Sequence, residues 1–427
     1  MNLVSNIGFL LMTAARSLRH HALSSAVTIV SAALAAGLVV SVFCIQSQTE
    51  IAFKGGALGF DAVLGARGSR EQLVFNAVFH MDVSPGNITW EMYEQIKARP
   101  GIKTAIPYAV GDNYRGYRII GTTQAIFEGF EYVRGKPFAF EPGGRAFDER
   151  YAEAVVGSFV AQKLGLKVGD KITPYHGMTF AERARHQREF VIVGIMKPTN
   201  TPVDRVVYLP IEGVFRLGGE AGVHVLRGTG ESYVAREGVP IPDEHKEVSA
   251  VLLEYASPAV GFQLDQFINR QGRVATLAPI GPVVTAIFEK IGWMHTVLTF
   301  IAYMIVAVAG GGILASIYNS INERRREFAI LRALGARKRM VFSSIVVEAC
   351  SIALVGAVLG YAVYLAILGV VAYYVRKETG IVLTLFYWHP SLFWTPIGMA
   401  AVGALAGVIP AVKAYATDVA TNLAPAS

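Results

Sequence analysis

Four long apolar runs divide the chain. They alternate with segments rich in polar and charged residues, and they extend over Ala26–Ile45, Thr296–Ile321, Val341–Val375 and Leu392–Val412. About twenty helical residues are enough to cross the hydrocarbon core of a bilayer. Each run is therefore predicted to form a transmembrane helix, and the third is long enough to tilt or to project beyond the membrane.

The first run has an alternative interpretation as the apolar part of a cleaved signal peptide. Arg16 and Arg19 precede it, and the small residues Ala33 to Ala36 would suit a cleavage site. The apolar stretch nevertheless continues as far as Phe43. We therefore expect the run to remain in the protein as a membrane anchor.

An amphipathic pattern precedes this first run. Between Asn6 and His21, apolar residues recur at helical spacing, while Arg16, Arg19 and His20 are polar. This pattern is typical of a helix lying in the cytoplasmic membrane interface. A simple extension of the first transmembrane helix explains it equally well.

The long segment between the first two spans mixes strand-like and helix-like patterns. A helix is predicted from Thr89 to Arg99, ended by Pro100-Gly101, and a second helix is predicted to end at Gly165. The strands are predicted from β-branched and aromatic residues over Ile102–Pro107, Tyr117–Gly121, Ala154–Val156, Phe190–Ile195 and Arg205–Leu209. The segment is thus predicted to be an α+β domain.

The end of this segment leads back to the membrane. Gly213–Val248 is rich in glycine and charge and is predicted to form exposed loops or a smaller lobe. Ala259–Val274 has a helical pattern, and another helix is expected to run from Pro279 into the second span. With Gln46–Phe53 after the first span, this last helix would form a paired stalk between membrane and domain.

Basic residues flank the apolar runs unevenly. Arg16 and Arg19 precede the first run, and seven lysines and arginines fall between Arg324 and Arg339, after the second. Positive charge accumulates on the cytoplasmic side of membrane proteins. Both chain ends are then cytoplasmic and the α+β domain is extracytoplasmic, with Arg376 and Lys377 in the short outer loop as a minor exception.

These observations predict the organisation of the whole chain. It is expected to be a membrane α-helical protein with four transmembrane helices and a large α+β extracytoplasmic domain inserted between helices 1 and 2. The predicted segments are a cytoplasmic amphipathic N-terminal segment (1–25), the first span (26–45), a periplasmic domain with stalk helices (46–292), the second span (293–321), a cytoplasmic loop (322–340), the third span (341–375), a short periplasmic loop (376–391), the fourth span (392–413) and a cytoplasmic tail (414–427).

The composition agrees with a membrane protein. Hydrophobic residues make up 53% of the chain and charged residues 17%, and the mean hydropathy is +0.41. Soluble domains usually carry about 25% charged residues. The net charge of +7 does not indicate a nucleic-acid partner, because much of it lies in the loop beside the membrane.

The familiar catalytic motifs are absent from the sequence. We find no Cys-x-x-Cys, His-Glu-x-x-His, Gly-x-Ser-x-Gly or phosphate-binding Gly-x-x-x-x-Gly-Lys-Ser/Thr pattern. His80 and Asp82 could supply two metal ligands, but a zinc site needs three or four. We therefore expect neither catalysis nor a metal or other cofactor on this chain.

Small residues recur within the spans. Gly356 and Gly360, and likewise Gly403 and Gly407, form Gly-x-x-x-Gly patterns. Such residues let two helices approach closely. Packing within one subunit and dimerisation with a second copy explain them equally well.

The loop after the second span combines basic residues with an apolar stripe. Phe328, Leu331 and Leu334 fall three residues apart, so a short helix would present an apolar side while its arginines meet water or an acidic partner. Gly335 would end that helix in a left-handed conformation. A purely solvated connector would not need the apolar stripe, so the pattern favours a docking helix.

The segment from Asn322 to Gly335, with sequence NERRREFAILRALG, strongly resembles the corresponding loop of MacB/FtsX/LolC-type ABC transporter permeases. The resemblance extends into the segment between the first two spans. There, Pro100-Gly-Ile, Val155-Val-Gly157 and the stretch from Leu164 to Lys171 are similar to landmarks of the MacB periplasmic core domain.

The resemblance implies a permease dimer bound to two copies of an ABC ATPase subunit in the cell inner membrane. MacB carries its ATPase on the same chain, whereas this sequence offers no room for one before Ala26, so a separate ATPase holding ATP and Mg²⁺ is expected. A periplasmic adaptor or substrate-carrier protein is compatible with the family. The residues implied to couple to the ATPase are Glu323, Arg324, Arg325, Glu327, Phe328, Leu331, Arg332, Leu334 and Gly335.

Three functions follow as hypotheses. The first is a permease subunit that passes ATP-driven motion to its periplasmic domain for export, extraction or handover of a substrate. The second is an FtsX-like transmembrane regulator that activates a periplasmic partner without transport; such regulators generally have smaller periplasmic domains, which favours the first hypothesis. The third is a membrane-bound enzyme, which the absence of catalytic motifs disfavours.

Overall fold

The computed structural model of the chain describes residues 12, 16–17, 19, 22–55, 59–128, 131–133, 136–150, 152–217, 239–333, 335–379 and 382–416. Most of the predicted amphipathic segment 6–21, much of the predicted loop region 213–248, and Leu334 lie outside these residues. The chain divides into two compact units. The helical unit comprises 1–49, 291–374 and 383–427, and the sheet unit comprises 50–290 and 375–382.

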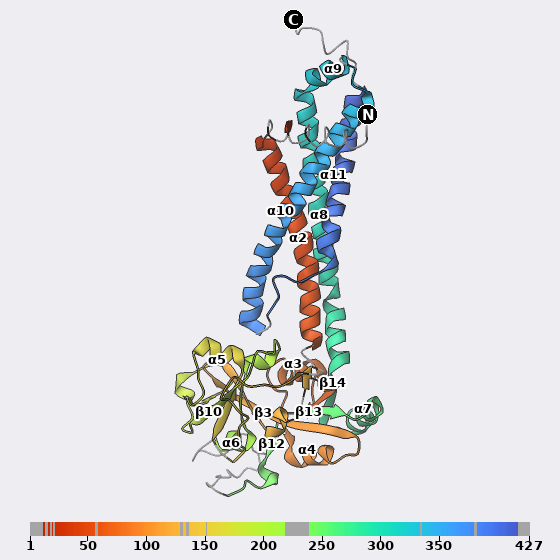
Figure 1. The fold of residues 1–427 in the computed structure, drawn as a ribbon. Coiled ribbons are helices and arrows are strands. Elements are labelled where there is room, and N and C mark those ends of the chain that lie inside the picture. The colour runs from red at the N-terminus through yellow and green to blue at the C-terminus, as the bar shows by residue number, and fades with distance from the viewer. Residues whose placement is uncertain are drawn as a thin grey trace. The chain divides into compact units, whose positions relative to one another are not determined.

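Four long apolar helices are present in the described part of the chain (Figure 1). They are α2 (Ala22–Gly55), α8 (Ile280–Glu323), α10 (Lys338–Thr379) and α11 (Pro390–Ala416). By length and composition, all four are candidate membrane spans. The mixed α/β domain lies in the sequence between the first and second of them, which confirms the predicted fold class.

Two of these helices contain residues of both units. The helix α2 continues past the predicted end of the first span to Gly55, and α8 begins at Ile280, directly after a strand of the sheet unit. The expected helix after Pro279 is thus present and is continuous with the second long apolar helix.

The sheet unit is built on one ten-stranded sheet (Figure 1). The strand order is β14-β1-β13-β3-β4-β11-β7-β10-β8, with β9 paired to β3. Its strands are β1 (Ala62–Ala66), β3 (Ile102–Tyr114), β4 (Tyr117–Thr122), β7 (Glu153–Val156), β8 (Lys171–Ile172), β9 (Tyr175–His176), β10 (Phe190–Ile195), β11 (Val207–Pro210), β13 (Ala250–Tyr255) and β14 (Ala275–Pro279). Two small sheets pair β2 (Ile88–Thr89) with β12 (Glu247–Val248) and β5 (Glu131–Val133) with β6 (Lys136–Pro137).

Strand β3 joins the two halves of the large sheet. Its first part pairs with β13 and its second part pairs with β4, where Ala109 lies opposite Gly121. A tight turn at Arg115 and Gly116, both with positive φ, returns the chain into β4. The sequence predicted that this strand would end at Pro107, whereas it continues to Tyr114. Pro107 is tolerated because β3 pairs only with β13 at that position. The side of β3 that faces away from β13 therefore needs no amide donor there.

The sheet is buried on both faces. Alternate residues of one strand enter different hydrophobic clusters, since Val207 and Leu209 pack on one side and Tyr208 on the other. The covering helices are α3 (Arg70–Ala77), α4 (Trp90–Lys97), α5 (Ser158–Leu164), α6 (Ile211–Phe215) and α7 (Pro258–Asp265). Single turns of other helix types are η1 (Gln124–Phe127), η2 (Glu182–Ala184), η3 (Pro202–Arg205), η5 (Asp243–His245) and η6 (Gln266–Gln271).

Local sequence signals account for several of these helices. Thr89 caps α4 by accepting a hydrogen bond from the Met92 amide at 3.3 Å, and Gly165 ends α5 with a φ of +67°. The helix predicted from Ala259 to Val274 instead consists of α7 followed by the π-helical turn η6. The predicted strand from Arg205 begins only at Val207, because η3 occupies the preceding residues.

Candidate functional site

The connection between α8 and α10 contains the short helix α9 (Arg325–Ala333). A single turn residue, Arg324, separates it from α8. After α9, the Gly335 amide donates to the Arg332 carbonyl at 3.1 Å and the Ala336 amide donates to the Leu331 carbonyl at 3.0 Å. These two hydrogen bonds, with Gly335 at φ +99°, form the left-handed helix end that the sequence predicted. Glycine suits this position because it has no Cβ to strain a backbone with positive φ.

Arg324 fixes the start of α9 through three contacts. Its Nη1 donates to Ser17 Oγ at 2.7 Å and to Glu348 Oε2 of α10 at 3.4 Å, and its Nε donates to Glu327 Oε2 at 3.1 Å. Ser17 Oγ donates to the other Glu348 oxygen. Glu348 and Ser17 are buried, so this is a largely desolvated charge pair in which both carboxylate oxygens accept bonds.

Phe328 holds the middle of α9 against the helical unit. Its ring is buried in a cluster that includes Ile317 and Ile321 of α8 and Val341 and Ile345 of α10. The Arg324 guanidinium carbon lies 5.1 Å from the centre of this ring. The sequence placed Phe328 on the docking side of the helix, whereas the structure places its side chain in the interior of the chain's own helical unit.

The opposite side of α9 is open and partly apolar. Ile330 and Leu331 are each 44% exposed, and the flanking Arg326 and Glu327 are also exposed. Glu323 is exposed at the end of α8, and Arg332 is half-buried. We call Ile330 and Leu331 the exposed pair of α9. The side chain of Arg325 lies outside the described residues, as does the whole of Leu334.

Two members of this site, Ser17 and Glu348, were not predicted from the sequence. Ser17 lies in the segment predicted to be either an amphipathic helix or an extension of the first span, and Glu348 lies inside the third apolar run. A single carboxylate within a predicted membrane span is costly and usually has a partner. That rule, applied to Glu348, would have identified it as a candidate partner for the loop arginines.

The glycine pairs lie at close contacts between helices of the same chain. A Cβ at Gly356 would lie 2.5 Å from the Ala32 Cβ of α2, and one at Gly360 would lie 2.9 Å from the Ala36 Cβ. A Cβ at Gly403 or Gly407 would similarly meet Ala349 of α10. The four glycines therefore allow close packing of α2 and α11 on α10 within the helical unit.

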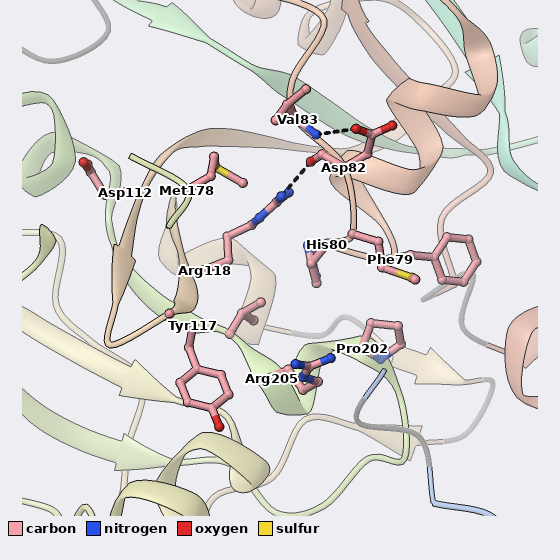
Figure 2. Close-up of a pocket in the computed structure, with 13 residues that line it drawn as sticks. Phe79, His80, Asp82, Val83, Asp112, Tyr117, Arg118, Met178, Pro202 and Arg205 are labelled. Carbon is pink, nitrogen blue, oxygen red and sulfur yellow. Dashed lines mark hydrogen bonds between the residues drawn. The ribbon is translucent and has the colours of Figure 1, made fainter. Parts of the chain in front are cut away.

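The sheet unit contains a cavity of about 430 Å³ (Figure 2). Arg118 lies in its wall and donates to the carbonyls of Asn76 at 3.1 Å and Asp82 at 2.6 Å. Burial lowers the pKa of Arg118 to about 10. The other lining residues include His80, Asp112 and Met178.

His80 and Asp82, the sequence's candidate metal pair, both line this cavity. Asp82 Oδ1 accepts a hydrogen bond from the Val83 amide at 2.7 Å. Burial, and then the nearby charge of Arg118, lowers the pKa of His80 to about 3. Among the described residues, these two side chains do not join a third ligand to form a metal-binding group.

Comparison with known proteins identifies two family regions. The model of the MacB-like periplasmic core domain matches residues 25–238, half of the chain, and the model of the FtsX-like permease C-terminal region matches residues 299–419. One model describes a periplasmic domain and the other a permease domain, and neither describes an ATP-binding domain.

Two curated relatives are macrolide export ATP-binding/permease proteins MacB. The protein from Mannheimia succiniciproducens is 27% identical over 133 residues, which cover 31% of this chain and 20% of the relative. The protein from Azoarcus sp. is 27% identical over 251 residues, which cover 55% of this chain and 33% of the relative. The chain thus spans between a fifth and a third of the length of these relatives.

Two solved structures are similar to part of the chain. The match to the periplasmic region of MacB from Actinobacillus actinomycetemcomitans covers 54% of this chain and 94% of the solved chain, with 12% identity and a TM-score of 0.33. The extracellular domain of the noncanonic ABC-type transporter YknZ from Gram-positive bacteria covers 51% and 98%, with 15% identity and a TM-score of 0.29. The two family models match the apolar helices and the inserted mixed domain of this four-span membrane protein, whose domain is periplasmic or extracellular. The chain therefore belongs to the MacB/FtsX family of ABC transporter permeases.

Proposed function

We propose that this chain is the permease subunit of an ABC transporter whose ATPase is a separate protein. In this proposal the exposed pair of α9 docks into the ATPase, and ATP-driven motion passes through the long helices to the extracytoplasmic domain. The domain then exports, extracts or hands over a substrate. ATP and Mg²⁺ are held by the ATPase, and two permeases and two ATPase subunits form the complex.

The observation that carries this proposal is the two-sided construction of α9. One side is fixed by Phe328 and by the bonds of Arg324, while Ile330 and Leu331 on the other side are exposed. A nine-residue helix is marginal in isolation, so α9 depends on these fixed contacts for its stability. A partner that binds the exposed pair would therefore push or pull on a helix that is already attached to α8 and α10.

The connections of α9 give this motion a route. The Arg324 turn follows directly from α8, and α8 begins next to β14 of the sheet unit. Arg324 also bonds Glu348 of α10. Displacement of α9 would thus act on two of the four long helices, and α8 continues without interruption to the sheet-unit sequence.

The proposed membrane arrangement follows the distribution of basic residues. The α9 connection carries a dense arginine and lysine cluster, which favours a cytoplasmic position. Both chain ends are then cytoplasmic, the membrane is the cell inner membrane, and the sheet unit lies in the periplasm. Docking of an ATPase on α9 requires this orientation, because ATP is a cytoplasmic energy source.

A charge placed in the exposed pair tests the docking step. The affinity-tagged chain and its Leu331→Arg variant would be purified from the native host, and co-purifying ABC-type ATPases would be quantified by mass spectrometry. An unpaired charge in an apolar contact costs several kcal/mol, so we expect about a tenfold or greater loss of the ATPase.

Val168→Arg is the matched control. Val168 is 43% exposed, close to the 44% of Leu331, and it lies in the sheet unit. This variant should retain the ATPase at the wild-type level. Equal ATPase recovery with Leu331→Arg and wild type would refute docking through the exposed pair.

A further inference from the structure

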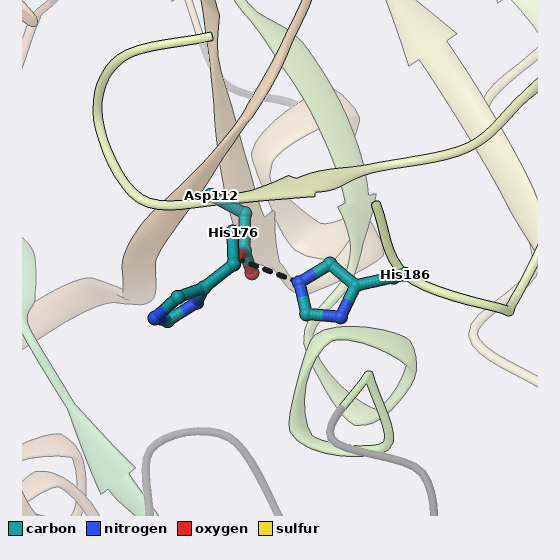
Figure 3. Close-up of side chains that lie close together, drawn as sticks. All are labelled: Asp112, His176 and His186. Atoms are coloured by element: carbon teal, nitrogen blue, oxygen red, sulfur yellow. Dashed lines mark hydrogen bonds and ion pairs between the residues drawn. The ribbon is translucent and has the colours of Figure 1, made fainter. Parts of the chain in front are cut away.

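A cluster of three potential metal ligands lies in the sheet unit, apart from the proposed ATPase-docking helix. It consists of Asp112, His176 and His186, whose ligand atoms all lie within 4.8 Å of one another (Figure 3). Asp112 belongs to β3 and His176 to β9, while His186 follows the η2 turn. No recognised sequence motif links these positions, and the sequence-based expectation was that the chain holds no metal.

The backbone places the three residues together. Asp112 and His176 are direct partners in the antiparallel pairing of β3 with β9. His186 is fixed by its amide, which donates to the Pro174 carbonyl at 2.9 Å, and by the neighbouring bridge between Tyr175 and Arg185. All three positions are thus held by main-chain bonds, which favours a preorganised group of side chains.

A neighbouring side chain secures the loop between the two histidines. Asn113, next to Asp112, donates from Nδ2 to the carbonyls of Gly177 at 2.9 Å and Thr179 at 3.2 Å. It therefore ties the residues that follow His176 to the strand that carries Asp112. Such supporting bonds around potential ligands are typical of metal sites.

The two distances from Asp112 to the histidines match the edges of a tetrahedral site. Asp112 Oδ1 lies 3.3 Å from His176 Nδ1 and 3.1 Å from His186 Nε2. Zinc–nitrogen bonds of 2.0–2.1 Å in a tetrahedron place neighbouring ligand atoms about 3.3 Å apart. The two distances from Asp112 are therefore those expected around a shared zinc ion, and the two histidine nitrogens lie within 4.8 Å of each other.

The burial of the cluster also suits a metal site that can exchange its ion. The Asp112 side chain is 1% exposed, whereas the His176 side chain is 61% exposed. A buried carboxylate is stabilised by a nearby cation, and an exposed ligand leaves a path for the ion. Asp112 also lines the 430 Å³ cavity, together with Met178 from the loop between the histidines.

We propose that Asp112, His176 and His186 bind one Zn²⁺ ion, with a fourth coordination position left for water or for a group of a bound ligand. Two imidazoles and one carboxylate form a donor set that zinc favours, and three protein ligands with one open position are typical of non-structural zinc sites. The proposal does not depend on the function of α9. It assigns the extracytoplasmic domain a reversible divalent-metal site.

Zinc binding to the full chain tests the proposal directly. The tag-free protein in detergent would be stripped with a chelator and titrated with ZnCl₂ in competition with a chromophoric chelator. We expect one high-affinity Zn²⁺ per chain. His186→Ala and Asp112→Asn should each weaken binding by about 100-fold or more, since even supporting residues contribute about 10–100-fold to metal affinity.

Two further variants separate ligation from a structural role. His186→Cys preserves a zinc ligand, so it should retain Zn²⁺ and, when loaded with Co²⁺, show a thiolate-to-cobalt absorption band that the wild type lacks. His245→Ala, a histidine outside the cluster, should bind Zn²⁺ like the wild type. Absence of high-affinity Zn²⁺ in the wild type, or unchanged affinity in His186→Ala and Asp112→Asn, would overturn the proposal.

Discussion

Arg324, the single turn residue between α8 and α9, lies 3.4 Å from Glu348 of α10 through its Nη1 atom. The pair adds a polar contact between two helices that also pack through apolar side chains, among them Ile317 of α8 and Ile345 of α10. Ser17 bonds both partners, so the first segment of the chain also contacts this site. The helix with the exposed pair is thereby tied at one end to three parts of the helical unit.

Removal of the Glu348 carboxylate should loosen α9. In Glu348→Ala, Arg324 and Ser17 lose an acceptor in a largely buried environment, and breaking such a pair typically costs about 3–5 kcal/mol. We expect a lower unfolding temperature in detergent and faster tryptic cleavage at the arginines of α9. Inside-out membrane vesicles provide the substrate for the cleavage assay.

Glu327→Ala is the control for this experiment. Glu327 also bonds Arg324, but its side chain is 60% exposed, and exposed ion pairs contribute about 0–1 kcal/mol. Its cleavage rate should stay close to that of the wild type. Similar effects of the two variants would show that the buried pair does not hold α9 in place.

The glycines of α10 lead to a second prediction. Gly356→Ala should destabilise the helical unit, because the new Cβ would lie 2.5 Å from the Ala32 Cβ and 3.0 Å from the Ile29 carbonyl oxygen, so α2 must move. Gly369→Ala is the control in the same helix, because a Cβ at Gly369 would meet no atom of another segment within 4 Å. The control should be neutral or slightly stabilising, since alanine favours helices by about 1 kcal/mol over glycine.

Thermal unfolding of the two alanine variants in the same detergent checks this difference. We expect the unfolding temperature to fall by several degrees for Gly356→Ala alone. Equal unfolding temperatures would mean that α2 and α10 do not pack as closely as the structure shows.

Much of this architecture could be predicted from local sequence patterns. Four apolar runs, the helix end at Gly165 and the glycine at position 335 each act through neighbouring residues, so their structural consequences follow from the sequence alone. The extension of β3 beyond Pro107 could not be predicted in this way, because it depends on which strand lies on each side of the proline. Pairing of this kind joins residues far apart in sequence, as with Pro107 and Val251.

The candidate sites likewise depend on contacts that local sequence patterns could not predict. The stripe of α9 was visible as a period of three, but that period could not show that Phe328 turns inward while Leu331 stays exposed. The choice depends on the cluster formed by α8 and α10. Likewise, Asp112 and His176 are 64 positions apart, and only the register of β9 on β3 brings them together.

The buried histidine in the cavity wall predicts a pH dependence of stability. Burial lowers the pKa of His80 from 6.5 to about 3 in the folded chain, so between these values the unfolded state binds a proton that the folded state does not. The stabilisation is fully present above pH 6.5 and is lost as the pH falls toward 3, by up to about 1.4 kcal/mol per pH unit.

His80→Asn should remove this contribution. Asparagine does not titrate, and it tolerates the left-handed backbone that His80 adopts at φ +56°. Urea titrations of the detergent-solubilised chain at several pH values, read by pulse proteolysis of the sheet unit, measure the slope. His245→Asn serves as the control, and an unchanged slope in His80→Asn would assign the pH dependence to other groups.

The orientation of α9 can be tested independently of any partner. Arg326 is exposed on α9, and the proposed function places it in the cytoplasm. In spheroplasts, a membrane-impermeant maleimide should therefore label Arg326→Cys only after the membrane is permeabilised. Val168→Cys, in the sheet unit, should be labelled in intact spheroplasts, and the parent chain with Cys44 and Cys350 gives the background. Labelling of Arg326→Cys from outside would place α9 beyond the reach of a cytoplasmic ATPase, because a helix on that side has no access to an ATP-driven partner.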